Sequence, residues 1–207
     1  MRHTYFVLLI VPIVTFAALP AATVQTGSKD FVHPGPNNDH PFKTIYFLPR
    51  TVTRVKIECY GPVGQRPLVP FPSAPYYGGA GGGSYATATF DVNPGADYGV
   101  EITRDYAAAL IGGPTKVVNA TSGIIATDRV QGGKGGRAAD CVGTTKLSGG
   151  DGGKAFLRGV DWLLGGYGGT AGPTVAGGNG TDATAAGAGI DGKGAVVSKF
   201  GMVRFSW

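Results

Sequence analysis

A repeat of paired glycines dominates the second half of this chain and limits what it can fold into. Of its 37 glycines, 22 fall within the 63 residues from Gly132 to Gly194. They form cassettes of the type Gly-Gly-X-Gly-Gly-X, the last one degraded, which begin at residues 132, 149, 165 and 177. The strict Gly-X-Y period and high proline content of collagen are both missing. The glycine therefore serves a different architecture.

The three-residue period of the cassettes matches an extended polyproline-II helix. An isolated polyglycine segment has no internal hydrogen bonds and loses much backbone entropy on ordering, so it is ordered only where several rods bond one another laterally. In such a bundle glycine faces inward and X faces outward, so Gly135→Val or Gly152→Val is expected to destabilise it and Lys134→Ala or Asp151→Ala to be near neutral. The alternative is flexible linkers. The fixed phase of the cassettes and the apolar residues between them favour rods.

The rest of the chain has the alternating, β-branched and aromatic pattern of strands. Strands are predicted at residues 43–48, 52–60, 84–90, 98–103, 116–119, 124–127 and within 195–207. The first two are predicted to pair, the next two to form a hairpin around Asn93-Pro94-Gly95, and the following two to form a weaker pair. The predicted fold is all-β, a small β-sandwich or jelly-roll-like domain carrying a polyglycine-II-type bundle of GGXGGX segments.

The N-terminus has the pattern of a secretory signal peptide over residues 1–22. Arg2 and His3 precede an apolar run over residues 5–19 and then small residues. The run is short for a membrane span and contains Pro12; an uncleaved anchor and a buried structural segment remain the alternatives. Residues 23–42, rich in Pro, Gly and Asn, are predicted to form an extended arm or linker, and 43–207 the glycine-rich β domain. The expected localisation is secreted or extracellular surface.

Export to an oxidising compartment bears on the two cysteines, Cys59 and Cys141. In such a compartment a cysteine pair favours a disulfide. Two separate buried thiols are the alternative. Two N-glycosylation sequons begin at Asn119 and Asn179, and they matter only in a eukaryotic host.

Charge and catalytic residue types argue against several functions. The formal net charge is +5, but Lys and Arg are scattered rather than clustered, so no nucleic-acid partner is expected. The two glutamates, Glu58 and Glu101, lie in predicted strands at positions that look solvent-facing. His33, Asp39 and His40 could ligate a metal, but without a supporting framework a solvated linker is favoured.

Two glycine-rich motifs partly match ligand-binding patterns, one for calcium and one for dinucleotides. Residues 177–182 and 187–191 fit the opening of a calcium-binding nonapeptide but lack its large apolar residue, and two degenerate copies cannot stack. Residues 187–192 match a dinucleotide fingerprint without its strand–helix context. No cofactor, metal or enzymatic activity is expected.

The order of motifs carries a family resemblance. Gly-rich residues 78–84 lead into Tyr85-Ala86-Thr87-Ala88-Thr89-Phe90-Asp91-Val92-Asn93-Pro94-Gly95-Ala96-Asp97-Tyr98, and the cassettes and a last strand ending in Trp207 follow. Over residues 43–207 the chain resembles the glycine-rich domain of bacteriophage tail-fibre and tail-tip adhesins, also seen in bacterial surface proteins. It departs where Cys59-Tyr60-Gly61-Pro62 replaces a Trp-Gly-Ala-Gly opening and where residues 101–110 replace a glycine-rich return. The resemblance implies receptor or surface binding without catalysis.

Candidate binding residues are large aromatics beside arginine, which dominate binding hot spots. The candidates are Arg158, Trp162 and Tyr167, followed by Tyr76, Tyr77 and Tyr106. Trp162 is expected to behave as core and Tyr167 as a contact. The expected partner is a cell-surface glycan or protein receptor. Alternatively, the chain is a structural subunit of an extracellular assembly, filament or virion whose copies join through rods or strand edges.

Overall fold

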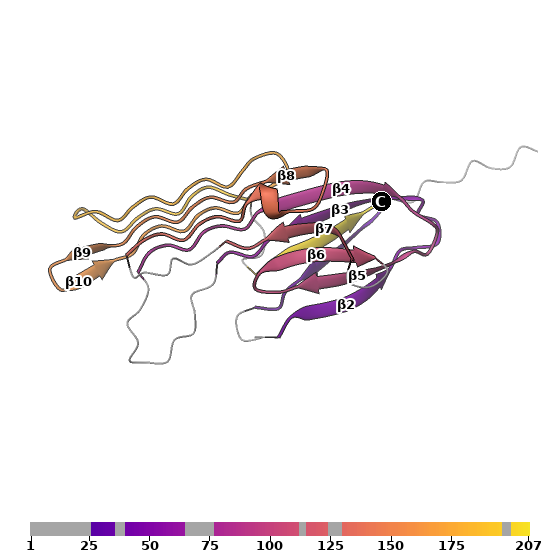
Figure 1. The fold of residues 1–207 in the computed structure, drawn as a ribbon, viewed down its shortest axis with the longest axis horizontal. Helices are drawn as coiled ribbons and strands as arrows, with labels where there is room; N and C mark the ends of the chain where they lie inside the picture. The colour runs from indigo at the N-terminus through magenta and orange to yellow at the C-terminus, as the bar shows by residue number, and fades with distance from the viewer. Residues whose placement is uncertain (1–25, 36–39, 65–76, 112–114, 124–129, 196–199) are drawn as a thin grey trace, which may run out of the picture.

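A computed structural model describes residues 26–35, 40–64, 77–111, 115–123, 130–195 and 200–207. Two antiparallel sheets pack against each other, and a bundle of extended segments continues from one end of them to a small hairpin at the opposite end of the molecule (Figure 1). The strands are β1 (Ser28–Val32), β2 (Phe42–Phe47), β3 (Arg54–Tyr60), β4 (Tyr85–Asp91), β5 (Asp97–Ile102), β6 (Tyr106–Ile111), β7 (Thr115–Thr121), β8 (Thr145–Leu147), β9 (Phe156–Arg158), β10 (Asp161–Leu163) and β11 (Met202–Ser206). The one helical turn in this part of the chain is η1 (Ala138–Asp140).

The sandwich has a five-stranded sheet in the order β1-β11-β3-β4-β8 and a four-stranded sheet in the order β2-β5-β6-β7. Its core lies between them, where Val55 and Ile57 of β3 meet Val100 of β5 and Val118 of β7, each at most 1% exposed. This follows from the alternation of apolar and polar residues along the strands. The all-β fold predicted from the sequence is confirmed.

Two of the three predicted strand pairs are wrong, although the strands themselves exist. β2 and β3 belong to different sheets, as do β4 and β5. The turn around Gly95, whose φ is +78°, therefore carries the chain from one sheet to the other instead of closing a hairpin. β7 pairs with β6, and its predicted partner 124–127 lies outside the described residues.

Five strands of the described part were not predicted: β1, β6, β8, β9 and β10. β6 contains three consecutive alanines, which have low strand propensity, and all three are fully buried. β1 lies in the predicted arm, pairs with β11 and is held by Arg204, which donates to Asp30 at 2.7 and 2.6 Å. The arm is thus partly an edge strand of the sandwich.

The signal peptide predicted over residues 1–22 lies outside the described residues. In the described part no helix has the length and apolar character to cross a membrane.

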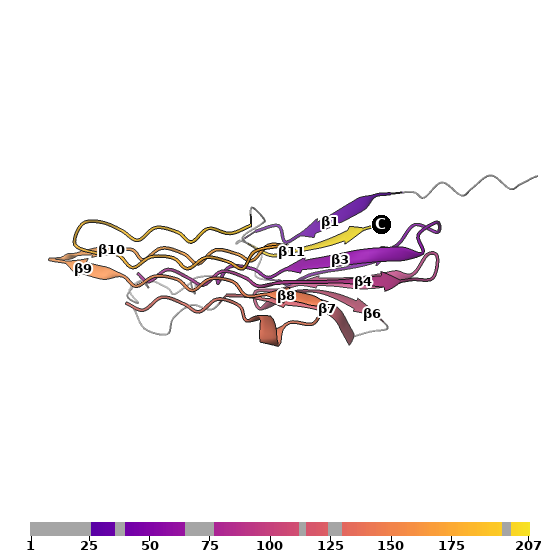
Figure 2. The same ribbon diagram turned by 90° about the horizontal axis from the view of Figure 1, so that it is seen from above.

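The glycine cassettes lie side by side as extended rods. The extended segments run side by side in both views (Figures 1 and 2), and their hydrogen bonds join parallel as well as antiparallel neighbours. The rods comprise residues 61–64, 77–84, 130–137, 148–155, 164–172, 177–183 and 189–195. At about 3.1 Å per residue, an eight-residue rod is roughly 25 Å long.

Lateral hydrogen bonds hold the rods together. In rod 148–155, the Gly149 amide donates to Gly136 O at 3.0 Å, and the next amide, of Gly150, donates to Gly169 O at 2.9 Å on a different neighbour. Three residues further on, the amides of Gly152 and Gly153 donate to the same two neighbouring rods. A three-residue period is what turns successive amides toward different neighbours.

The close approach of the rods explains the glycines. A Cβ at Gly152 would overlap the carbonyl oxygen of Gly79, and one at Gly135 would overlap that of Gly149. By contrast, Gly187, in a turn between rods, has nothing within 4 Å of such an atom. The inward cassette positions therefore exclude any side chain because the obstacle is backbone.

Rod ends also pack on the outer face of the five-stranded sheet. Ala171 joins Tyr60, Tyr85 and Met202 in a second buried cluster. This covers Glu58, which is 6% exposed and accepts a 2.7 Å hydrogen bond from the Tyr85 hydroxyl. The expectation that Glu58 faces solvent is wrong, because the end of β3 that carries it is covered on both faces.

The predicted disulfide is corrected by the structure, in which Cys59 and Cys141 are separate buried thiols. Cys59 Sγ donates to the carbonyl oxygen of Val118 at 3.5 Å inside the sandwich. Cys141 Sγ lies 3.0 Å from Ser84 Oγ, where the rods meet the sheets. Each sulfur has partners of its own, so the alternative of two independent thiols holds.

Candidate binding site at the distal hairpin

The far end of the rod bundle is closed by the hairpin β9–β10, which forms the outermost tip of the molecule (Figures 1 and 2). Arg158 and Asp161 are paired in register, and the chain turns through Gly159 and Val160 between them. Gly159 has a φ of +67°, which a two-residue hairpin turn requires. Val160 is 93% exposed at the apex.

The hairpin is supported by two stacked aromatic rings. The rings of Tyr77 and Trp162 lie 4.6 Å apart between centroids and are inclined by only 9°. Tyr77 begins rod 77–84, whereas Trp162 is on β10, so the stack fastens the hairpin to the end of a different rod. Both residues are half-buried.

Exposed apolar side chains concentrate at this end. Of the twelve large hydrophobic residues exposed in the described part, six lie here. Four come from the hairpin and its flank, Phe156, Leu157, Val160 and Leu164; Ile190 and Val130 are on rods whose backbones bond directly to Leu164 and Ala155. An apolar patch at the tip of an otherwise polar bundle is typical of an interaction site.

The structure brings together three of the predicted binding residues, Arg158, Trp162 and Tyr77, at the hairpin. Tyr167 lies on rod 164–172, where its amide donates to Asp191 Oδ1 at 2.7 Å. It is therefore on the side of the bundle rather than at the tip. Tyr76 lies outside the described residues.

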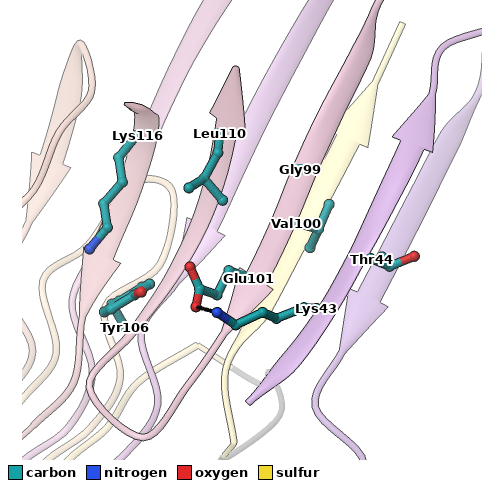
Figure 3. A pocket seen from close by; sticks show the side chains of 8 residues that line it. All are labelled: Lys43, Thr44, Gly99, Val100, Glu101, Tyr106, Leu110 and Lys116. Carbon is teal, nitrogen blue, oxygen red and sulfur yellow. Dashed lines mark ion pairs between the residues drawn. The ribbon is translucent and has the colours of Figure 1, made fainter. Parts of the chain in front are cut away.

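Tyr106 is in the sandwich, far along the chain and the fold from the hairpin. It lines an open hollow of about 440 Å³ on the outer face of the four-stranded sheet, together with Lys43, Glu101, Leu110 and Lys116 (Figure 3). Gly99 lies at the centre of this face. Because it has no side chain to fill the space between its neighbours, a hollow forms there.

The polar groups of the hollow are paired with one another. Lys43 Nζ lies 2.7 Å from Glu101 Oε1, and Lys116 Nζ lies 3.3 Å from the centroid of the Tyr106 ring. Burial raises the pKa of Tyr106 to about 12, aided by its hydrogen bond to Glu101. Burial opposes ionisation of Glu101, but its bonds from Lys43 and Tyr106 outweigh that effect and lower its pKa. Lys116 covers one face of the Tyr106 ring, so that face is not open for stacking.

Sequence reasoning missed the exposed aliphatic residues Leu157 and Val160. The signal was present, since Phe-Leu-Arg and Asp-Trp-Leu flank Gly-Val, a two-residue turn between two apolar runs.

The group of possible metal ligands, His33, Asp39 and His40, lies only partly within the described residues. Those described residues contain no cluster of three or more His, Cys, Asp or Glu side chains able to hold a metal ion. His33 is 8% exposed, accepts from the Gly35 amide at Nδ1 and faces the His40 carbonyl oxygen at Nε2. Asp39, the other member of that predicted group, lies outside the described part.

Comparison with known proteins found no family model, no curated protein and no solved structure that matches the chain. The fold thus defines an all-β sandwich that extends into hydrogen-bonded glycine rods, and the adhesin resemblance remains an expectation from the sequence.

Proposed function

We propose that this chain is an exported, non-catalytic surface-binding module whose binding surface is the distal hairpin, β9–β10. The observation that carries the proposal is the concentration of exposed apolar side chains around Val160 and Leu157 at the end of the bundle. The rods hold this hairpin roughly 25 Å beyond the sheets, where a large surface can be approached without steric conflict from the sandwich. The resemblance to phage and bacterial adhesins points the same way.

The rod bundle suits a protein that holds a binding surface in place more than one that catalyses a reaction. Lateral backbone bonds order the rods, so the hairpin is held by a scaffold with little freedom of its own. A rigid support reduces the entropy lost on binding. A cell-surface glycan or protein receptor is the expected class of partner.

The test compares two valine substitutions at opposite ends of the rods. Labelled wild-type protein, Val160→Asp and Val175→Asp are incubated with a panel of intact bacterial and eukaryotic cells. Val175 is 68% exposed, in the turn after rod 164–172 at the sandwich end. Attachment should be retained by Val175→Asp and lost in Val160→Asp. Equal attachment of the two variants would place the binding surface elsewhere.

A second candidate function is a structural subunit of an extracellular assembly. It is favoured by β2, which is one of the two edge strands of its sheet and exposes Ile45 and Phe47 by 62% and 66%. Edge strands of this kind pair with strands of other chains unless they are blocked. Light scattering and negative-stain images that showed fibres, dispersed by Ile45→Lys, would support this function over the first.

A further inference from the structure

The edges of the two sheets differ in how they are protected against pairing with another strand. Within the described part of the chain, β8 is only three residues long, and β1 carries exposed charged residues. β7 is covered over part of its length by Val142, whose amide and carbonyl both bond to Asn119. Short length, charge and a covering segment are the usual ways in which edge strands avoid pairing.

β2 is the edge that lacks these protections. Among the described residues no segment pairs with its outer side, and the strand is six residues long without a proline. Its one charged side chain, Lys43, is turned onto the sheet by an ion pair with Glu101 at 2.7 Å (Figure 3). β2 is therefore open to another strand.

The backbone groups of β2 point outward at alternate residues. Just beyond β2, the Leu48 amide donates to the carbonyl oxygen of Ala96 at 2.9 Å, on the side of β5. Because successive residues of a strand direct their amides and carbonyls to opposite sides, those of the even-numbered residues of β2 face β5. Those of Lys43, Ile45 and Phe47 face the open edge. Ile45 and Phe47 also have exposed side chains, so the edge combines outward backbone groups with apolar contacts.

These three residues are complementary to themselves in an antiparallel arrangement. When Ile45 lies opposite Ile45 of the partner subunit, Lys43 of each copy lies opposite Phe47 of the partner subunit, and every outward residue is in a hydrogen-bonded pair. The two Ile45 side chains then meet, and the Phe47 ring lies beside the alkyl chain of a lysine. In one neighbouring register Phe47 lies opposite Pro41. In the other, Lys43 lies opposite Pro49. Proline has no amide to donate, so both of these registers lose a hydrogen bond.

We propose that the partner of β2 is a second copy of this chain, which pairs through its own β2 about a two-fold axis at Ile45 and joins the two four-stranded sheets into one. Each copy uses its open edge, so the assembly closes as a dimer and does not grow into a filament. A single strand pair is a small interface, and small interfaces are typical of weak complexes, so the dimer forms reversibly as the protein concentration rises. Because the paired strands run in opposite directions, the two rod bundles leave the dimer at opposite ends (Figure 1).

The experiment is analytical ultracentrifugation of wild type and three variants over a range of concentrations. Ile45→Lys and Ile45→Glu should each raise the dissociation constant about tenfold or more, because like charges directly opposite each other destabilise a strand pair. An equimolar mixture of the two should recover the dimer, because opposite charges then face each other across the axis. The matched control is Val175→Lys, an equally exposed residue in the turn after rod 164–172, whose end packs on the other sheet; it should dimerise like wild type. Each substitution is at an exposed side chain, so all variants should melt like wild type.

Other results overturn the proposal. Wild type that stays monomeric at every concentration, or a dimer that persists in Ile45→Lys, would show that β2 is not the interface. A dimer lost in both Ile45 variants and not recovered in their mixture would show that the two isoleucines are not opposite each other. Fibres in place of a dimer would mean that the edge pairs in an open arrangement. The dimer does not rest on the hairpin as binding surface: Val160→Asp should leave it intact, so the two proposals fail independently.

Discussion

The backbone amide of Asp151 donates a 2.8 Å hydrogen bond to the side-chain oxygen Oδ1 of Asn179 on the neighbouring rod. The next X residue of the same rod repeats the arrangement, since the Lys154 amide donates to Asp182 Oδ1 at 2.7 Å. The amides at X positions point away from the rod contacts made by the glycines. Asn and Asp side chains of adjacent rods accept these amides, so some outward residues are part of the lateral bonding.

Replacement of Asn179 by alanine is therefore expected to destabilise the bundle by about 0.5–1.5 kcal/mol, the net contribution of one hydrogen bond. Asn179→Asp retains the Oδ1 acceptor and should stay close to wild type. Urea unfolding followed by circular dichroism gives both values. Identical losses in the two variants would mean that the bond to Asp151 contributes nothing.

Asp151 should make the stability of the bundle sensitive to acid. Burial opposes its ionisation, but the bond from Lys134 Nζ at 2.8 Å and that from the Gly135 amide at 2.9 Å outweigh burial, and its pKa is lowered. A carboxylate with a depressed folded-state pKa contributes stability above its unfolded pKa and loses it as the pH falls through the folded value.

Comparison of wild type with Asp151→Asn tests this between about pH 5 and pH 2. The wild-type free energy of unfolding should fall more steeply with decreasing pH, and the two curves should converge at the acid end. Parallel curves over the whole range would show that ionisation of Asp151 does not stabilise the fold. The Lys134 pair is exposed, so its own contribution should be at most about 1 kcal/mol.

Gly152→Val should be among the most damaging single changes in the chain. The added side chain would collide with the carbonyl oxygen of Gly79, which is itself in a bonded rod. Overpacking typically costs about 1–3 kcal/mol, and a backbone obstacle places this case at or beyond the upper end. Gly187→Ala, where there is open space, is the matched control and should change the melting temperature little. Similar melting shifts in the two variants would contradict the close packing of the rods.

The bundle illustrates what the sequence could and could not predict. The phase of the cassettes is sufficient to predict that Gly135 and Gly152 face other rods, because only glycine fits against backbone. It does not show that Asp151 bonds to Gly135 and Asn179, because that depends on which rods become neighbours. Because the Asp151 carboxylate accepts bonds from Lys134 and Gly135, Asp151→Ala is now expected to lose stability and not to be near neutral.

The same distinction applies to the sandwich and the site. Alternation along β3 predicts that Val55 and Ile57 are buried, but it does not predict that rods cover the other face and bury Glu58. Turn chemistry at Gly95 predicts a reversal, not whether it stays within one sheet. Residue type is enough to select Trp162, Arg158 and Tyr77 as candidates, but only the packing of the rods shows that Tyr77 stacks on Trp162.

The two thiols should be inert in the folded protein. Burial raises the pKa of Cys59 well above its ordinary value, so little thiolate is available. Modification by a thiol-specific chromogenic reagent should be very slow in buffer and should report two thiols in denaturant. A reducing agent should leave the melting temperature unchanged. A shift on reduction, or no free thiols after unfolding, would restore the disulfide.

The stack of Tyr77 and Trp162 should stabilise the position of the hairpin at the end of the rods. Trp162 is only half-buried, so Trp162→Ala is expected to cost less than the 3–5 kcal/mol of a fully buried aromatic. If its main contact is the Tyr77 ring, Tyr77→Ala should have a similar effect, and the double variant should lose less than the sum of the two. The coupling energy from such a cycle should be about 0.5–1.5 kcal/mol, the range of aromatic pairs.

Tyr167→Ala is the control for this cycle, because Tyr167 lies on the side of a rod and its amide bond to Asp191 does not need the ring. Its effect on stability should add to that of Trp162→Ala. Attachment measured on the same proteins then separates the two roles: loss with Trp162→Ala and retention with Tyr167→Ala place recognition at the hairpin. The opposite pattern would move recognition to the side of the bundle, as the sequence alone suggested for Tyr167.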